Sequence, residues 1–312
     1  MEPRYIFIVG LPRTGTKLML NVLENSQDQR WYMTPENFYL GRAFRSGVRQ
    51  QMRKIGNMSI EANVHKLVEA MYAGQFNGEY WASLADGTLG VNKATMLQAI
   101  LNSDRTDKGI YEALLQVHAE ITDQTILGDK TGPHLYHVPT LLEWFPEAKV
   151  IHTFRDPRAV LASEHKKLLR QFQGQIQRAQ KAGQLARVIL LKLQEPFLPL
   201  LIVLYITTAW LYAVRLHYQY KKLYPNNYYL SKFEDLVNEP EKSLAKLCSF
   251  LNIEFQREML NPPKVGSSYD RQANPGFDQQ TLTRWQDYLK PWMNGWLLLW
   301  GKKHLKEFGY IR

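Results

Sequence analysis

The stretch that decides the fold is residues 5–17, YIFIVGLPRTGTK, near the start of the chain. Its first five residues form an uninterrupted apolar run, which predicts a buried β-strand that ends at Gly10. A glycine-rich loop follows, and the apolar positions after Lys17 predict a helix. This order makes an anion cradle, because backbone N–H groups converge in the loop and the helix N-terminus carries a partial positive charge.

The loop between residues 10 and 17 supplies groups that suit a phosphate. Gly10 and Gly15 let the backbone approach an anion closely, because neither residue has a Cβ atom. Arg13 contributes a permanent planar charge, Lys17 contributes a mobile ammonium, and threonine hydroxyls add further donors. The candidate phosphate-binding residues of the loop are Leu11, Pro12, Arg13, Thr14, Gly15, Thr16 and Lys17.

Strand-like and helical segments alternate along the rest of the chain. Apolar runs predict strands at residues 125–127, 149–154 and 227–233. Helical patterns cover residues 61–72, 108–121, 138–144 and 240–251, whereas residues 31–60 are mixed and turn-rich. The alternation predicts an α/β fold, with a central, mostly parallel sheet flanked by helices. No linker divides the 312 residues, so we expect one P-loop-like domain, 1–312, with a helical insertion or flap at about 164–196.

Composition limits the partners and the compartment. The net charge of +10 indicates anionic partners. Nucleic acid is not expected, because the chain has no zinc spacing, no RNP-like aromatic box and no basic region joined to heptads. Cys248 is the only cysteine, so no internal disulfide can form, as suits a reducing compartment. The N-terminal apolar run is too short for a signal peptide, and we predict a cytoplasmic enzyme. The sequence does not determine the oligomeric state.

Two neighbouring segments have unusual compositions. Between residues 164 and 192, seven Lys and Arg side chains accompany a single acid, Glu164. This pattern suits either a solvated helix or a basic flap beside an anion site that shapes an acceptor pocket. Residues 197–214 carry no charge, but Pro199 interrupts them and no second span returns the chain. We expect a core helix there, with peripheral membrane contact at 197–214 as the alternative.

Two motifs resemble those of sulfotransferases that use 3′-phosphoadenosine 5′-phosphosulfate (PAPS). The loop GLPRTGTK is similar to the family's phosphosulfate loop, P-[RK]-[ST]-G-T-[TS]. The stretch FRDPRAVLAS is similar to the second motif, in which a strand ends in an arginine, here Arg155, and a serine, here Ser163, follows eight residues later. The segments GDKTGPH and FPEAKVIHTFRDPR resemble the bacterial and Golgi-type branch, whose loop reads PRTGT. The resemblance covers nearly the whole chain.

The resemblance implies a sulfuryl transfer from PAPS to a hydroxyl or amine, without a metal. The acceptor would be a small molecule, either a metabolite or a lipid. Arg13, Thr16 and Lys17 would hold the phosphosulfate, with Lys130 as a second cation at the sulfonate. In the family, the arginine and serine of the second motif grip the 3′-phosphate. The remaining cofactor-binding residues implied by the resemblance are Phe233 near the adenine, and Thr283, Arg284 and Trp285 in a C-terminal strap that also includes SSYD.

The general base has two candidates. Glu36, in MTPENF, lies where the tyrosyl-protein branch of the family keeps its catalytic glutamate. His134 lies three residues after Thr131, near the position of the catalytic histidine in the cytosolic branch, and its ordinary pKa suits the task. The choice stays open at this point. The chain also departs from the family pattern at Lys17, where Thr or Ser is usual, at the inserted Gly132, and at Phe233, where Tyr is usual.

Two other functions compete with sulfuryl transfer. A P-loop kinase or NTPase would use the pattern G-x₄-G-K-[ST], with Asp129 or Asp156 as a magnesium ligand. Here Thr16 precedes Lys17, so the lysine and the threonine are transposed. A non-catalytic module could bind acidic glycans or a membrane through its basic face. That function gives no role to the arginines and the serine of the two motifs.

Overall fold

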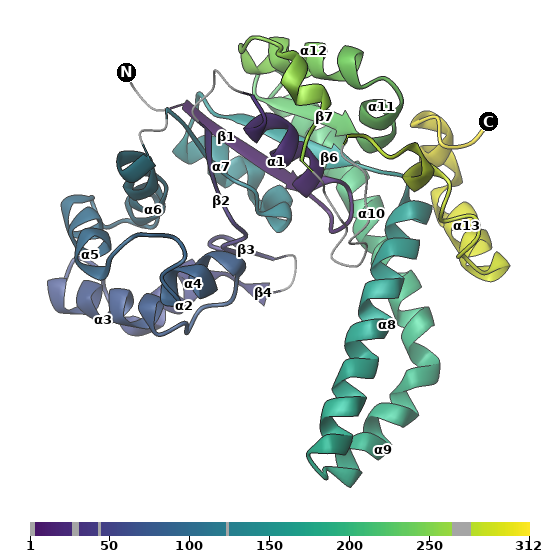
Figure 1. The fold of residues 1–312 in the computed structure, drawn as a ribbon, viewed down its shortest axis with the longest axis horizontal. Coiled ribbons are helices and arrows are strands. Elements are labelled where there is room, and N and C mark those ends of the chain that lie inside the picture. The colour runs from purple at the N-terminus through teal and green to yellow at the C-terminus, as the bar shows by residue number, and fades with distance from the viewer. Residues whose placement is uncertain (1–3, 27–30, 43–44, 123–124, 264–275) are drawn as a thin grey trace.

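A five-stranded parallel β-sheet forms the centre of the molecule (Figure 1). The computed structural model describes residues 4–26, 31–42, 45–122, 125–263 and 276–312. All neighbouring strands of this sheet run parallel, in the order β2-β5-β1-β6-β7. The strands are β1 (Arg4–Gly10), β2 (Trp31–Thr34), β5 (Ile126–Asp129), β6 (Lys149–Phe154) and β7 (Tyr228–Lys232). The predicted α/β fold with a parallel sheet is therefore confirmed.

Both faces of the sheet are covered, which explains why the central strands read as continuous apolar runs. Ile6 and Ile8 of β1 pack into one core cluster, together with residues of α1 (Thr16–Glu24) and α12 (Pro240–Leu251). Phe7 and Val9 point to the opposite face and join the larger cluster. That cluster includes residues of α3 (Glu61–Tyr72), α6 (Asp107–Thr122), α7 (Val138–Trp144) and α10 (Leu198–Leu223).

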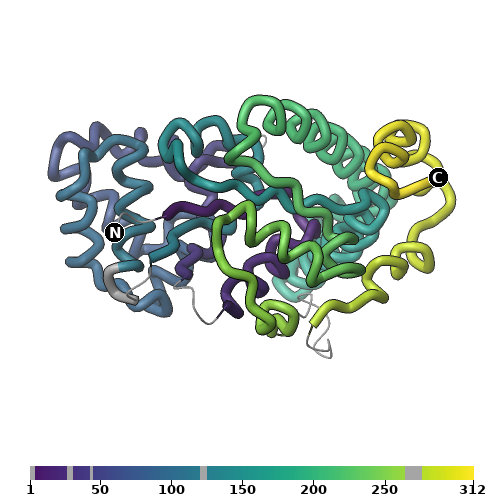
Figure 2. Tube along the Cα trace, turned by 90° about the horizontal axis from the view of Figure 1, so that it is seen from above, coloured from purple at the N-terminus to yellow at the C-terminus, as the bar shows by residue number. Residues whose placement is uncertain are grey.

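Helices between β2 and β5 form a lobe beside the β2 edge of the sheet (Figures 1 and 2). The lobe contains α2 (Val48–Ile55), α3, α4 (Glu79–Ala85), α5 (Lys93–Asn102) and α6, preceded by the hairpin of β3 (Gly41–Arg42) and β4 (Arg45–Ser46). Within residues 31–60, which read as mixed and turn-rich, the structure contains β2 and α2, neither of which was predicted. Strand β2 has four residues and lies at the edge of the sheet beside β5. It is too short to produce a recognisable apolar pattern in the sequence.

An antiparallel helical arm projects from the sheet where the basic insertion was expected (Figure 1). It consists of α8 (Pro157–Lys181), α9 (Leu185–Gln194), the 3₁₀ turn η2 (Glu195–Phe197) and the first half of α10. Pro157 starts α8, and Asp156 caps it by accepting a 2.8 Å hydrogen bond from the Arg158 N–H. The helix runs through Gly174 and ends before Gly183, whose φ of +67° turns the chain.

The apolar segment 197–214 comprises the last residue of η2 and most of α10, and its two faces differ. Ile202, Val203 and Ile206 pack against Val160 and Leu161 of α8, as the core-helix prediction requires. The other face is exposed, so the segment is only half a core helix. Among the described residues, one helical stretch, Leu185–Leu223, is long and apolar enough to span a membrane by length and composition alone.

Two helices and three 3₁₀ turns complete the described chain. A short helix, α11 (Phe233–Asn238), follows β7 directly, and α13 (Pro291–Glu307) packs beside α8 and α10 near the C-terminus. The remaining 3₁₀ turns are η1 (Gly132–His137), η3 (Arg257–Leu260) and η4 (Gln279–Leu282).

Candidate active site

The candidate residues lie at one edge of the sheet, because parallel strands bring their carboxyl ends together. In sheet order, the segment after β2 carries Glu36, and the residue after β5 is Lys130. The glycine-rich loop follows β1 at the centre. Arg155 follows β6, and Phe233 follows β7. The topology therefore sets a carboxylate and an amine at one end of the edge, the anion loop in the middle, and an arginine and an aromatic ring at the other end.

The loop after β1 has a left-handed conformation at two residues. Arg13 has a φ of +69°. Gly15, which directly precedes α1, has a φ of +100°. A Cβ atom at Gly15 would lie 2.6 Å from Cδ2 of Phe233, so this ring packs directly against the loop. Glycine is therefore required at this position on two grounds, its backbone angle and its contact with the ring.

Threonine side chains inside the fold hold the loop in shape. Thr14 is buried, and its hydroxyl donates to the Leu11 carbonyl at 2.7 Å and lies 2.8 Å from the Thr153 hydroxyl. The expectation that Thr14 offers its hydroxyl to a ligand is therefore not met, because that group is used within the fold. Thr16 and Lys17 are the first two residues of α1, and Lys17 is exposed.

Hydrogen bonds join the loop to the second motif. Arg13 Nε donates to Ser163 Oγ at 2.7 Å, and Arg155 Nη1 donates to the Arg13 carbonyl at 3.2 Å. The three residues that the two motifs singled out thus lie together. The Arg13 side chain is directed to Ser163 on α8, so it lies with the pair expected to hold a 3′-phosphate.

Arg155 is a partly buried cation with unused donor capacity. Its Nη2 donates to the Thr281 carbonyl at 2.7 Å, and its guanidinium carbon lies 3.9 Å from the centre of the Phe233 ring. The Nε atom is buried and has no hydrogen-bond partner. Burial lowers the pKa of Arg155 to about 10, with Glu234 opposing and Arg13 adding to this effect. The group is still a cation at neutral pH, and an anion would satisfy its open donor.

Glu36 and Lys130 face each other at the other end of the edge. Lys130 Nζ lies 3.7 Å from Glu36 Oε1. Only 8% of the Lys130 side chain is exposed, against 38% for Glu36, so solvent or a ligand reaches the carboxylate more easily than the ammonium. The two groups come from the segments that follow β2 and β5, which are neighbours in the sheet. Sequence reasoning named both residues but did not predict this contact.

Comparison with known proteins identifies the family. A family model described as the sulfotransferase family matches residues 3–195, more than half of the chain. The chain belongs to the sulfotransferase family. The comparison with curated proteins found no match.

Solved structures share the sulfotransferase fold with this chain. The sulfotransferase domain from the curacin biosynthetic pathway is 18% identical, with 97% of each chain covered and a TM-score of 0.54. The sulfotransferase domain from the Synechococcus PCC 7002 olefin synthase is 17% identical, with a TM-score of 0.51. That match covers 97% of this chain and 95% of the domain. The kinase or NTPase alternative is not favoured by these findings.

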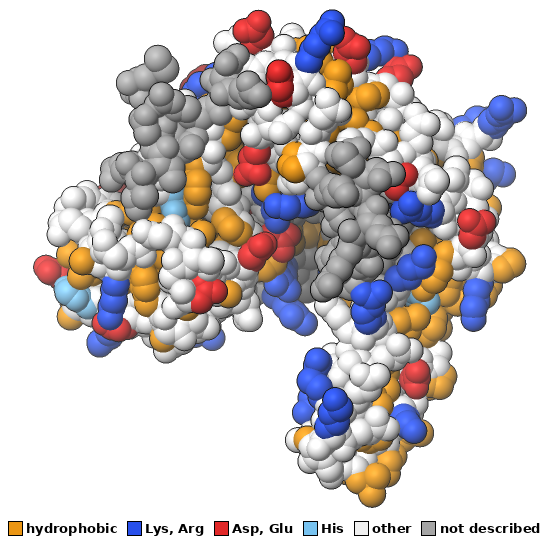
Figure 3. Space-filling model, viewed as in Figure 1, with side chains coloured by type: hydrophobic (Ala, Val, Ile, Leu, Met, Phe, Trp, Pro, Cys, Tyr) orange, Lys and Arg blue, Asp and Glu red, His pale blue; other side chains and the backbone are white. Residues whose placement is uncertain are grey.

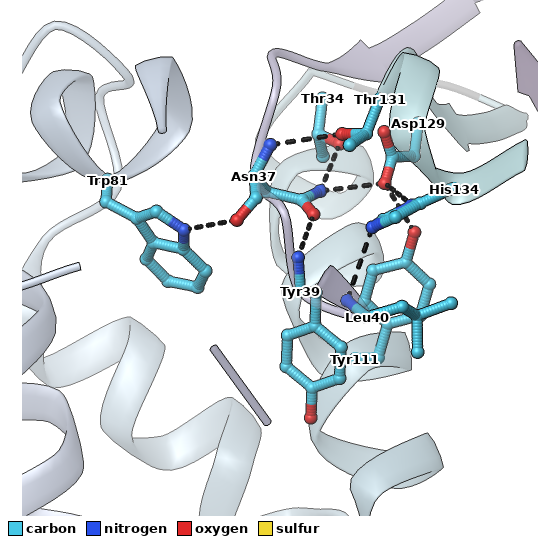
Figure 4. A network of polar contacts seen from close by, with 9 residues as sticks. All are labelled: Thr34, Asn37, Tyr39, Leu40, Trp81, Tyr111, Asp129, Thr131 and His134. Atoms are coloured by element: carbon cyan, nitrogen blue, oxygen red, sulfur yellow. Dashed lines mark hydrogen bonds and ion pairs between the residues drawn. The ribbon is translucent and has the colours of Figure 1, made fainter. Parts of the chain in front are cut away.

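A buried polar network underlies the Glu36 segment of the sulfotransferase (Figure 4). His134 lies within it, only 1% exposed, and its Nε2 accepts from the Leu40 N–H at 3.2 Å. The ring proton therefore resides on Nδ1, which lies 3.0 Å from Asp129 Oδ2. Both nitrogens thus lie against groups of the fold, and the ring is closed off from solvent. This geometry disfavours His134 as the general base and leaves Glu36 as the better-placed candidate.

Asn37 and Asp129 connect the ends of β2 and β5. The Asn37 amide donates to Asp129 Oδ2 at 2.9 Å, and the Tyr111 hydroxyl donates to the same oxygen at 2.6 Å. The Asn37 N–H donates to Thr131 Oγ1 at 3.1 Å, so the residues directly after Glu36 and Lys130 are linked. Burial would raise the pKa of Asp129, but the neighbouring His134 and the side-chain hydrogen bonds with His134, Thr131 and Tyr111 lower it overall. The sequence analysis missed Asn37, and no motif marks it.

The predicted C-terminal strap lies partly within the described residues. Arg155 contacts its start through the Thr281 carbonyl, and the Trp285 ring packs 4.2 Å from the Arg158 guanidinium. Thr283 and Arg284 are exposed, and Arg284 forms an ion pair with Asp278. The segment SSYD, at 267–270, lies outside the described residues. In the part of the chain that is described, no group of three or more His, Cys, Asp and Glu side chains is placed to hold a metal ion.

Proposed function

We propose that this sulfotransferase takes its sulfuryl group from PAPS and transfers it to a hydroxyl of a small acceptor. The PRTGT loop supports its placement in the bacterial and Golgi-type branch. The observation that carries the proposal is the partly buried Arg155 guanidinium, whose Nε is buried and has no partner, beside the Arg13–Ser163 pair. A buried cation with an open donor is costly unless an anion completes it, and a 3′-phosphate is such an anion.

The donor nucleotide fits the chemistry of this edge of the sheet. Arg155 and Ser163 would hold its 3′-phosphate, with Arg13 beside them. The backbone N–H groups of the loop and Thr16 at the start of α1 would hold the 5′-phosphate, because a helix N-terminus favours a negative charge. The Phe233 ring, already stacked on Arg155, would support the cofactor at the β7 end.

Lys130 and Glu36 would act on the transfer itself. When bound, the donor supplies a sulfuryl group on a good phosphate leaving group. Glu36 would accept the proton of the acceptor hydroxyl, since its carboxylate is partly open to solvent. The Lys130 ammonium, held beside Glu36, would stabilise negative charge that grows on the sulfonate and leaving oxygens. The exposed Lys17 would add a further positive charge at the loop.

We infer an acceptor of low molecular weight, a metabolite or a lipid. The two structural neighbours come from an olefin synthase and from a biosynthetic pathway, which supports a small-molecule acceptor over a protein.

The proposal is tested by calorimetry with adenosine 3′,5′-bisphosphate and with adenosine 5′-phosphate. Wild type is expected to prefer the bisphosphate, independently of magnesium. Arg155→Ala is expected to lose this preference, whereas Arg215→Ala, at an exposed arginine of α10, retains it. Arg155→Lys and a thermal melt of each variant separate lost contact from lost folding. Equal affinity of wild type for the two nucleotides, or tight ATP–magnesium binding instead, overturns the proposal.

A further inference from the structure

The outer side of the helical arm carries an exposed apolar surface. Its residues recur at spacings of three and four along α9, η2 and the start of α10, so they share one side of the helix. We name this surface the apolar stripe. It consists of Leu185, Ile189, Leu190, Leu193, Phe197, Leu200, Leu201, Leu204 and Tyr205, each 37–71% exposed.

Folding of the arm does not account for the stripe. The inner side of α9 is held to α8 by a small cluster that contains Val188, Leu191 and Ile176. The inner side of α10 is held by Ile202 and its neighbours in a second cluster. Both helices are therefore packed through their inner sides alone. A contiguous exposed surface of large aliphatic side chains is uncommon on a soluble protein and marks a contact with a partner or a membrane.

The positive charge around the stripe favours an anionic partner. Residues 165–205 carry one acid, Glu195, and seven basic side chains. At 3.6 residues per turn, the exposed Arg187 and Lys192 fall on opposite borders of the stripe. Their long side chains can lie along apolar surface while the charged ends reach an aqueous boundary. The basic residues of the stretch 165–205 are Lys166, Lys167, Arg170, Arg178, Lys181, Arg187 and Lys192.

The space-filling view shows the same division on the arm (Figure 3). Hydrophobic side chains gather at its free end and along one edge, and Lys and Arg side chains lie beside them. An apolar surface bordered by basic groups complements an anionic lipid surface, with acyl chains under the stripe and headgroup phosphates at its borders. A second copy of the chain is a poorer match, because it would bring two basic arms together.

The packing of α10 argues against a membrane-spanning role for the arm. Only 39% of the most apolar window within Leu185–Leu223 is buried, yet the buried part includes Ile202, Val203 and Ile206, which hold the helix in the core. The helix therefore cannot leave the fold to span a bilayer. The stripe extends over about 30 Å of helix, at 1.5 Å per residue from Leu185 to Tyr205, which suits a helix that lies along an interface.

We propose that the arm docks this enzyme on an anionic membrane surface through the apolar stripe and its basic border. The same helix pair begins at the candidate active site, because Ser163, the partner of Arg13, lies near the start of α8. Docking therefore fixes the position of the site relative to the lipid surface. The proposal goes beyond the proposed sulfuryl transfer and requires no bound nucleotide.

Vesicle flotation tests the stripe. The probes are vesicles of phosphatidylcholine alone and of phosphatidylcholine with about one quarter phosphatidylglycerol. Wild type is expected to float with the anionic vesicles, less so at high salt. A triple variant with Ile189→Glu, Leu193→Glu and Leu201→Glu is expected to stay in solution. The matched control is Leu299→Glu, at a 72% exposed leucine of α13, which is expected to float like wild type.

A second variant tests the basic border. Replacing Lys181, Arg187 and Lys192 together by glutamine is expected to weaken anionic-vesicle binding by at least about tenfold, since each basic group near such a surface adds to the affinity. Thermal melts and bisphosphate calorimetry on every variant show that the fold and the donor site are intact, which separates failure of docking from failure of the proposed function.

Three outcomes overturn the docking proposal. The first is a wild-type protein that floats with neither kind of vesicle. The second is a stripe variant that floats as well as wild type, because the contact then lies elsewhere. The third is a wild-type dimer, seen by sedimentation velocity without lipid, that the stripe variant converts to a monomer while vesicle binding is absent. That result assigns the stripe to a second copy of the chain.

Discussion

The Lys130 ammonium lies 3.7 Å from a carboxylate oxygen of Glu36. The two groups have different candidate roles, charge stabilisation for Lys130 and proton acceptance for Glu36. The ammonium is nearly buried at the end of β5, where its position is fixed. The carboxylate is partly exposed at the end of the neighbouring β2. Such a pair places a proton acceptor on the open side and a fixed positive charge on the inner side of the same site.

Glu36→Gln is expected to lower kcat by about 10²- to 10⁴-fold, because glutamine has a similar shape but cannot accept the acceptor's proton. Affinity for adenosine 3′,5′-bisphosphate is expected to stay unchanged, since Glu36 lies at the other end of the sheet edge from Arg155. Steady-state kinetics with labelled PAPS and calorimetry measure the two quantities. The control is Glu61→Gln, at an exposed glutamate of α3.

His134→Asn tests the rival candidate for the general base. His134→Asn is expected to lower thermal stability, because it disturbs the contacts with Leu40 and Asp129. If the folded variant loses kcat as strongly as Glu36→Gln does, with an altered pH–rate profile, the assignment of the base to Glu36 is wrong.

Asn37→Ala tests whether the buried network positions the base. Asn37 donates to Asp129 and accepts from the Tyr39 N–H, so the change leaves buried groups unpaired and is expected to cost about 1–3 kcal/mol of stability. The segment that carries Glu36 then loses its fixed position, and kcat is expected to fall while bisphosphate affinity is retained. A melt, a kinetic assay and a titration on one preparation check this. Lower stability with an unchanged kcat would mean that the network is structural only.

The sequence predicted the parts of this molecule that depend on local patterns. The buried runs of β1 and β6 and the glycine-rich loop could be identified because both faces of the sheet are covered and the loop needs glycine at Gly15. The motifs also marked Arg13, Arg155 and Ser163 as cofactor-binding residues, and hydrogen bonds bring the three together, although Arg13 was expected at the phosphosulfate and not beside Ser163.

The rest depends on strand order, which no local pattern encodes. Because β2 and β5 are neighbours, Glu36 meets Lys130 and Asn37 meets Asp129, although these residues are far apart in the chain. The choice between Glu36 and His134 required the same information. The exposed side of α10 was missed for a different reason: an uncharged segment predicts burial on all sides, whereas this helix packs on one side only.

Ser163→Ala is expected to weaken adenosine 3′,5′-bisphosphate binding by roughly 10- to 100-fold, the effect of losing one hydrogen bond to a charged group. Binding of adenosine 5′-phosphate is expected to change little, because that nucleotide lacks the 3′-phosphate. Calorimetry with both ligands gives the two affinities. An equal loss for both nucleotides would place Ser163 at the 5′-phosphate or in the loop scaffold, where its contact with Arg13 Nε matters.

Gly132→Ala tests whether the inserted glycine in GDKTGPH is needed for its close contact with the loop after β1. A Cβ atom there would lie 2.6 Å from the Gly10 carbonyl oxygen, and a backbone atom cannot move aside as a flexible side chain can. The substitution is therefore expected to displace the loop after β1 and to weaken donor binding by at least about tenfold, roughly 1.4 kcal/mol. The control is Gly295→Ala in α13, where a Cβ atom meets nothing within 4 Å and where alanine is expected to stabilise the helix. Unchanged calorimetry for Gly132→Ala would show that the loop tolerates the shift.

His152→Gln is expected to reduce the loss of unfolding free energy that occurs when the pH falls from 7 to 5. His152 is fully buried in β6 beside the Tyr228 hydroxyl, at 2.6 Å, and burial, aided by His217, lowers its pKa to about 3. The ring is thus neutral in the folded protein but protonated in the unfolded chain below about pH 6.5. Its contribution to stability is complete above pH 6.5 and is lost as the pH falls from there toward 3, which amounts to about 2 kcal/mol between pH 7 and pH 5.

Urea unfolding at pH 7 and pH 5 measures this difference for wild type, for His152→Gln and for His65→Gln, a control at an exposed histidine of α3. Wild type and the control are expected to lose the same stability on acidification, and His152→Gln is expected to lose about 2 kcal/mol less. Some acid sensitivity remains in every variant, because burial also lowers the pKa of His118, His137 and His217 to about 4. An unchanged slope in His152→Gln would show that this ring is already protonated in the fold, with the Tyr228 hydroxyl oxygen accepting a hydrogen bond from its N–H.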